Sequence, residues 1–116
     1  MAYHLVALAP RRPAPVERLI EGFLTGPGVT PPDLRRTVMD RAAALARGVA
    51  PPDVPSDLAG YLDRVATAAH SIGDADLDGL RTAGHSEDEI IELTEAAALG
   101  ASLARLDIAL AAIGED

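Results

Sequence analysis

One acidic stretch has the residue types and the spacing of a calcium-binding loop. The chain reads DADLDG at residues 74–79, so oxygen ligands alternate before a glycine: Asp74, Asp76, Asp78 and Gly79. These match positions 1, 3, 5 and 6 of an EF-hand, but position 12, where that loop has a bidentate Glu, is His85. Without that ligand, a cation site here is only a weak alternative. We favour a structural role, in which Asp74 caps a helix and the other carboxylates lie near its positive N-terminus.

A second group of polar residues has the chemistry to bind and act on a small organic acid: His70, Arg105, Asp63 and Glu95. Arg105 falls on an apolar helical stripe with Ile108, where an unpaired charge is costly, so we expect a carboxylate partner or an anionic ligand. Asp63, Glu95 or an acid of another subunit are the candidate partners. Asp63 and His70 lie two helical turns apart on one edge, and His70 could move a proton. We favour structural pairing over a ligand site.

The composition excludes several classes of chemistry. Cysteine is absent, and all ten basic residues are arginine. Thiol nucleophiles, disulfides, thiolate metal sites and lysine Schiff bases are therefore excluded. The chain also has no Gly-x-Ser-x-Gly motif and no glycine-rich phosphate loop after a strand, so hydrolase and nucleotide-binding functions have no support. We expect no cofactor.

The charge balance bears on partners and location. The net charge of -8 argues against nucleic acid and against an anionic membrane surface as partner, since both require a basic patch. No apolar run of about 18 residues suggests a membrane span, and no charged segment precedes the short apolar part of residues 1–10. We therefore expect a cytoplasmic protein. Residues 1–50 hold seven arginines and residues 51–116 hold fourteen acids, so a basic helix could dock on an acidic one.

Length and helical periodicity predict one all-α domain. At 116 residues the chain is too short for two ordinary domains. We expect residues 1–16 to form an N-terminal arm and residues 17–116 to form a single compact helical domain. Helix start and stop signals predict about five helices, at residues 17–24, 32–47, 57–71, 75–83 and 87–113. The predicted N-terminal caps are Ser56, Asp74 and a capping box formed by Ser86 with Glu89.

The last predicted helix is long, and beyond Ala96 it is apolar on nearly every side. One stripe runs from Ile90 to Ile108, and the opposite side carries leucines: Leu99, Leu103, Leu106 and Leu110. A single neighbouring helix cannot cover such a surface, so it lies in a larger core or in an interface. The small residues of AAALGAS fit a tight helix crossing or a subunit contact. Since an alanine-rich core of this size stabilises a monomer weakly, we expect a homo-oligomer formed through this helix.

The block LRTAGHSEDEIIELTEAAALGASLARLDIAL, after a helix and an acidic turn, resembles the carboxymuconolactone decarboxylase and alkyl hydroperoxidase-like (AhpD-like) superfamily. The resemblance covers residues 57–113 and implies an all-helical fold completed by oligomerisation. Redox members carry Cys-x-x-Cys-x-x-x-His, whose positions fall near Ala69, Ile72 and Asp76, and none of the three matches. Asp57 lies near the place of the upstream Glu of that motif. Thiol-dependent peroxidase activity is therefore excluded, whereas the decarboxylase branch needs neither metal nor cysteine and acts on small carboxylates.

Two classes of function remain open from the sequence. We favour a cysteine-free superfamily member whose long apolar helix serves assembly or partner binding, because the chemical residues of the redox members are missing. The alternative is a cofactor-independent enzyme of the lyase or decarboxylase type, or a binder of a small carboxylic acid. In that alternative Arg105 holds the carboxylate and His70 moves a proton.

Overall fold

The part of the chain that the structure describes is entirely helical. The computed structural model describes residues 12–114, and its elements are α2 (Ala14–Thr25), α3 (Pro32–Arg47), α4 (Ser56–Thr67), the 3-10 turn η1 (Ala69–Ser71), α5 (Asp74–Thr82) and α6 (Glu87–Gly114). The all-α prediction of about five helices with a long C-terminal one is confirmed for these residues. Residues 1–11, most of the predicted arm, lie outside the described residues, and α2 begins at Ala14 instead of the predicted Glu17.

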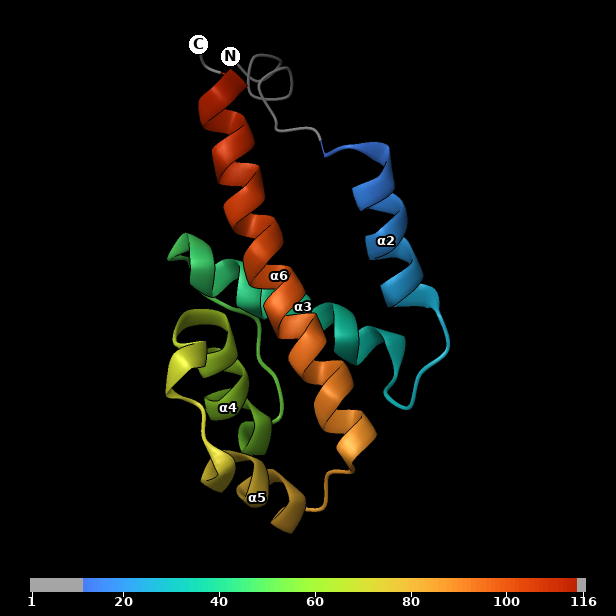
Figure 1. The fold of residues 1–116 in the computed structure, drawn as a ribbon, viewed down its shortest axis with the longest axis vertical. Helices are drawn as coiled ribbons and strands as arrows, with labels where there is room; N and C mark the ends of the chain where they lie inside the picture. Colours follow the sequence, from blue (N-terminus) through green and yellow to red (C-terminus); the bar gives the residue numbers. More distant parts are fainter. Residues whose placement is uncertain (1–11, 115–116) are drawn as a thin grey trace.

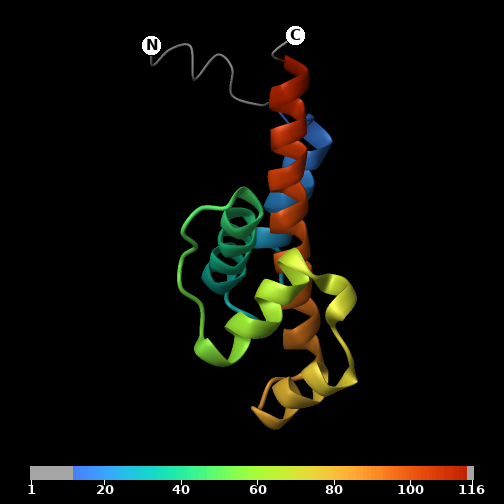
Figure 2. The ribbon, with the colours of Figure 1, turned by 90° about the vertical axis from the view of Figure 1, so that its left-hand side faces the viewer.

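The longest helix, α6, runs along most of the molecule, and α3 and α4 pack against it (Figure 1). α3 crosses the middle of α6, α4 packs against both, and α5 lies near the end where α6 begins (Figures 1 and 2). α2 packs against α3. The most deeply buried core residues come from α3, α4 and α6: Val38, Leu62, Ala66, Leu93, Ala96, Ala97, Ala101 and Ala104. α6 therefore forms the centre of the core, and it also carries two of the candidate site residues, Glu95 and Arg105.

α3 and α6 cross at close range because Gly100 has no side chain. A Cβ at Gly100 would collide with the backbone carbonyl of Met39 on α3. Ala97 and Ala101 flank this glycine and are almost completely buried. The inner side of the AAALGAS run therefore serves a tight helix crossing within the chain, which is one of the two roles that the sequence suggested.

Two helix ends follow their local sequence signals. The capping box of α6 is confirmed, because the Glu89 N–H donates to Ser86 Oγ at 3.1 Å and Glu89 Oε1 accepts from the Ser86 N–H at 3.3 Å. At the end of α3, Gly48 adopts the left-handed conformation with φ of 73°, where glycine is favoured. Both signals involve residues close together in sequence, so the local pattern was sufficient to predict them.

The caps predicted from Ser56 and Asp74 are wrong. Both residues are the first helical residue of their helix, and neither helix has a side-chain hydrogen bond from its capping residue. At α5 the carboxylate of Asp76 instead accepts a hydrogen bond from the Gly73 N–H at 2.9 Å. The prediction failed because each helix begins one residue earlier than the sequence pattern indicated.

α4 is shorter than predicted, because it ends at Thr67 and not at Ser71. Ala68 leaves the helical conformation with φ of -153°, and the turn η1 follows. Arg64 stabilises this break: its Nε donates to Ser71 Oγ at 3.2 Å, and its guanidinium also forms an ion pair with Asp76 of α5. The helix therefore ends where a contact with another element fixes the chain, which periodicity alone does not reveal.

α6 is long and apolar enough, by length and composition, to cross a membrane. The expectation that no segment has this character is therefore wrong, because one 18-residue window of α6 has a mean hydropathy of 1.6 despite the charged residues of the helix. A core helix of a soluble protein passes the same test. Only 39% of the most apolar window of α6 is buried within the chain, so much of its surface is open to a further contact.

Candidate functional site

The four predicted site residues are not gathered in one place. Asp63 forms a bidentate ion pair with Arg41, with Nε–Oδ1 at 2.7 Å and Nη2–Oδ2 at 2.9 Å. Arg105 instead donates from Nη2 to the backbone carbonyl of Ala66 at 2.8 Å. No carboxylate among residues 12–114 forms an ion pair with Arg105. Asp63, one of the expected partners, is bound to Arg41 instead.

His70 and Glu95 are both exposed, on different elements. His70 lies on η1, so the expected two-turn relation to Asp63 along one helix does not hold. Glu95 lies on the outer side of α6 and borders two surface grooves. Within residues 12–114 no hydrogen bond or ion pair joins any two of His70, Arg105, Asp63 and Glu95. The structure therefore places no acid–base pair of the predicted kind.

The acidic turn is held by arginine and backbone contacts. Asp76 forms an ion pair with Arg64, and Asp78 lies 2.8 Å from Arg81 Nη1. The Gly73 N–H and then Arg64 lower the pKa of Asp76 below its ordinary value. Among the residues that the structure describes, no group of three histidine, aspartate or glutamate side chains could hold a metal ion. Asp74, the remaining residue of the weak cation alternative, is exposed.

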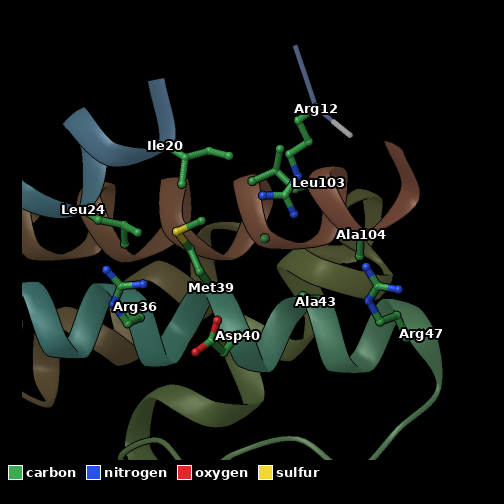
Figure 3. A pocket seen from close by; sticks show the side chains of 11 residues that line it. Arg12, Ile20, Leu24, Arg36, Met39, Asp40, Ala43, Arg47, Leu103 and Ala104 are labelled. Carbon is green, nitrogen blue, oxygen red and sulfur yellow. The ribbon is translucent and has the colours of Figure 1, made fainter. Parts of the chain in front are cut away.

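A buried acid that the sequence analysis missed lies on α6. Asp107 is 7% exposed and accepts from Arg12 Nε at 2.8 Å and from Arg12 Nη2 at 2.6 Å, while Arg47 Nη2 lies 3.2 Å away. The hydrogen bonds that Arg12 donates to Asp107 are the main cause that raises the pKa of Arg12. Arg12 and Arg47 also border a cavity between α2, α3 and α6 (Figure 3). The sequence could have indicated this acid, because a carboxylate in an apolar helix needs a cationic partner, as an unpaired buried charge is costly.

A second buried network joins α6 to the loop between α2 and α3. Glu92 accepts from the Val29 N–H at 2.6 Å, from the Thr30 N–H at 3.1 Å and from Thr30 Oγ1 at 2.6 Å. Arg35 Nη1 lies 3.4 Å from the same carboxylate, and its Nη2 donates to the carbonyls of Leu24 and Gly26. The hydrogen bond from the Thr30 hydroxyl, followed by the one from the Val29 N–H, lowers the pKa of Glu92 to about 2. The network fixes the loop onto α6 and presents no cavity of its own.

His85 links the start of α6 to α4. Its Nε2 lies 2.6 Å from Asp57 Oδ2 and its Nδ1 lies 3.5 Å from Glu89 Oε2. The hydrogen bond with Asp57 is the main cause that raises the pKa of His85 above its ordinary value of 6.5. The side chain of His85 is only 17% exposed. Asp57 thus serves a contact between helices.

The outer side of α6 is an exposed stripe with a regular spacing. Its residues recur at alternating intervals of four and three and are all exposed: Ile91, Glu95, Ala98, Ser102, Arg105 and Ala109. These residues therefore share one face of the helix, on which Ala98 and Ser102 are small and Glu95 and Arg105 carry opposite charges. Grooves of about 250 Å³ and 340 Å³ border the stripe, the second between α6 and the side chains of Leu19 and Phe23 on α2. We call these six residues the outer stripe.

Comparison with protein-family models, with curated proteins and with solved structures finds no significant match. The similarity of residues 57–113 to the carboxymuconolactone decarboxylase-like superfamily therefore stays a prediction. The chain's own contacts and exposed surfaces carry the proposals below.

Proposed function

We propose that this chain is a helical assembly protein, a cysteine-free relative of the carboxymuconolactone decarboxylase-like superfamily, in which two copies associate through α6. The observation that carries the proposal is the outer stripe, an exposed face of α6 with small side chains at its centre and with Glu95 and Arg105 placed symmetrically about that centre. The lyase alternative has less support, because its acid and base are not brought together among residues 12–114.

The outer stripe is complementary to itself when two copies of α6 run in opposite directions. If the twofold axis crosses the outer stripe midway between Ala98 and Ser102, residues whose numbers average 100 face each other. Ile91 then packs against Ala109 of the second copy, and Ala98 packs against Ser102 of the second copy. The small side chains at the centre allow the close helix separation of about 8 Å that lies at the low end of helix packing.

The same register places opposite charges together. Glu95 faces Arg105 of the second copy, so a dimer contains this pair on each side of its centre. Glu95 forms no ion pair within residues 12–114, and Arg105 makes its single hydrogen bond to a backbone carbonyl there, which leaves other guanidinium donors free. The charge complementarity selects an antiparallel second copy as the partner.

A lipid bilayer is a poorer match for this surface. Glu95 and Arg105 both lie on the outer stripe, and charged side chains inside a bilayer are costly. Asp107, on the inner side of the same helix, is held by Arg12 and Arg47 from the rest of the chain. Because α6 also supplies much of the chain's own core, insertion of α6 into a membrane would expose the buried apolar side chains of α3 and α4.

A charge-exchange experiment tests this proposal. In Glu95→Arg or in Arg105→Glu, like charges face each other twice per dimer, so the dissociation constant should rise about tenfold or more. The double variant restores opposite charges and should return most of the affinity. Mass in solution by sedimentation, measured across protein concentration, reports each value, and circular dichroism checks that each variant is folded.

The exchange separates this interface from a general effect of charge. Arg18→Glu, on the exposed side of α2, changes net charge as Arg105→Glu does but lies outside the outer stripe, and it should leave the dimer intact. A wild-type chain that stays monomeric at high concentration contradicts the proposal. So does a double variant that associates no better than the two single variants.

A further inference from the structure

The cavity between α2, α3 and α6 combines an apolar floor with arginine side chains at its edge (Figure 3). Its volume is about 160 Å³, and its apolar lining comes mainly from Ile20, Leu24, Met39 and Leu103. Arg36 and Arg47 stand at opposite ends of the α3 side, with Met39 between them (Figure 3). A cavity of about this size, when apolar, accepts a molecule as large as benzene.

One of the arginines that line this cavity is not paired with an acid among residues 12–114. Three arginines line it, Arg12, Arg36 and Arg47, together with the single acid Asp40. Asp107, behind the cavity, binds Arg12 through both carboxylate oxygens and contacts Arg47 through one, and Glu17 also forms an ion pair with Arg12 at 3.5 Å. Arg36 is thus the one lining arginine without a carboxylate contact among residues 12–114.

Arg36 is the arginine available to a ligand. It is exposed, and within residues 12–114 its guanidinium forms no hydrogen bond and no ion pair, including none with Asp40. Arg47 at the other end has one contact, to Asp107, which occupies one nitrogen of its guanidinium group. Guanidinium groups bind carboxylates with two parallel hydrogen bonds, a geometry that a free Arg36 can offer.

We propose that this cavity binds a small monocarboxylate with an apolar body, whose carboxylate meets Arg36 while its hydrocarbon part lies against Met39 and Leu103. Arg36, the one arginine without a carboxylate contact, matches a single carboxylate, and the apolar side chains match a hydrocarbon body better than a fully hydrated phosphate. The volume restricts the ligand to a small molecule, because drug-sized ligands occupy sites of about 300 Å³ or more.

This site is independent of the proposed dimer. The cavity uses Gly100, Leu103 and Ala104 on the inner side of α6, whereas the outer stripe lies on the opposite side of the helix. Binding at the cavity therefore leaves the outer stripe free. A chain that does not dimerise can therefore still bind the acid, and a chain that does not bind the acid can still dimerise.

The test is binding of benzoate and hexanoate to the full chain, followed by thermal shift and calorimetry at fixed ionic strength up to about 10 mM ligand. Wild type should be stabilised by at least one of the two acids, whereas the uncharged analogue benzamide and inorganic phosphate should bind at least tenfold more weakly. Arg36→Gln should weaken the bound acid about tenfold or more, since it removes a charge-assisted contact. Arg18→Gln, an exposed arginine outside the cavity, should leave binding unchanged.

A second pair of variants tests the apolar part of the site. Ala43→Leu adds volume inside the cavity and should abolish binding, whereas Ala59→Leu on α4 adds the same volume elsewhere and should not. The proposal is overturned if neither acid binds, or if phosphate or benzamide binds as well as the acids. Unchanged affinity in Arg36→Gln or in a folded Ala43→Leu overturns it as well.

Discussion

Replacing Glu92 by glutamine should loosen the loop that joins α2 to α3. The ionised carboxylate accepts three hydrogen bonds from Val29 and Thr30 and lies 3.4 Å from Arg35 Nη1. Glutamine keeps one oxygen but presents an amide group to these donors, and it leaves Arg35, which is 3% exposed, without its counter-charge. Leaving a buried charge unpaired is among the larger single effects on stability.

The size of the effect follows from the pKa of Glu92. Its pKa is lowered from 4.5 to about 2, and a pKa shift of one unit corresponds to a free-energy difference of about 1.4 kcal/mol. Ionised Glu92 therefore contributes about 3 kcal/mol to the free energy of unfolding at neutral pH, as an upper value because its side chain is 18% exposed. The contribution is complete above the unfolded pKa of about 4.5 and is lost as the pH falls towards 2.

Urea unfolding of wild type and Glu92→Gln at one protein concentration measures this directly. At neutral pH the variant should be less stable by about 2 to 3 kcal/mol, and by about pH 3 more than half of that difference should be gone. Glu21→Gln, an exposed glutamate on α2, should show no such dependence. A difference between wild type and Glu92→Gln that is near zero at neutral pH, or that stays constant down to pH 3, would refute the reasoning.

Two further predictions concern single positions. His85→Gln should reduce stability below about pH 6 by less than about 1 kcal/mol, because Asp57 is largely exposed, and the raised pKa of His85 means that this difference disappears as the pH rises through the folded pKa. Urea unfolding at pH values on both sides of that pKa checks it, and a difference that grows with pH contradicts the assignment. Gly100→Ala should destabilise the fold by about 2 kcal/mol or more, because its Cβ collides with the Met39 carbonyl, whereas Gly60→Ala on α4, which has open space, should stabilise by about 0.5 to 1 kcal/mol. Thermal unfolding ranks the two variants, and a Gly100→Ala protein as stable as wild type would show that the crossing is looser than described.

Local signals in the sequence determined the helical framework of this protein. The capping box of Ser86 with Glu89 and the left-handed Gly48 involve neighbouring residues, so periodicity and cap chemistry were enough to predict the helices that they begin or end. The exclusion of thiol and lysine chemistry also follows from composition alone. The predicted end of α4 at Ser71 failed because a contact between Arg64 and α5 decides where that helix stops.

The polar contacts that define the candidate sites were decided by tertiary structure. Arg12 and Asp107 are 95 positions apart, and Arg35 and Glu92 are 57 apart, so no local pattern could pair them. The sequence correctly marked α6 as more apolar than one neighbour can cover, because composition counts hydrophobic residues. Only the fold decided which of them are buried against α3 and which form the outer stripe, since that depends on where the other helices lie around α6.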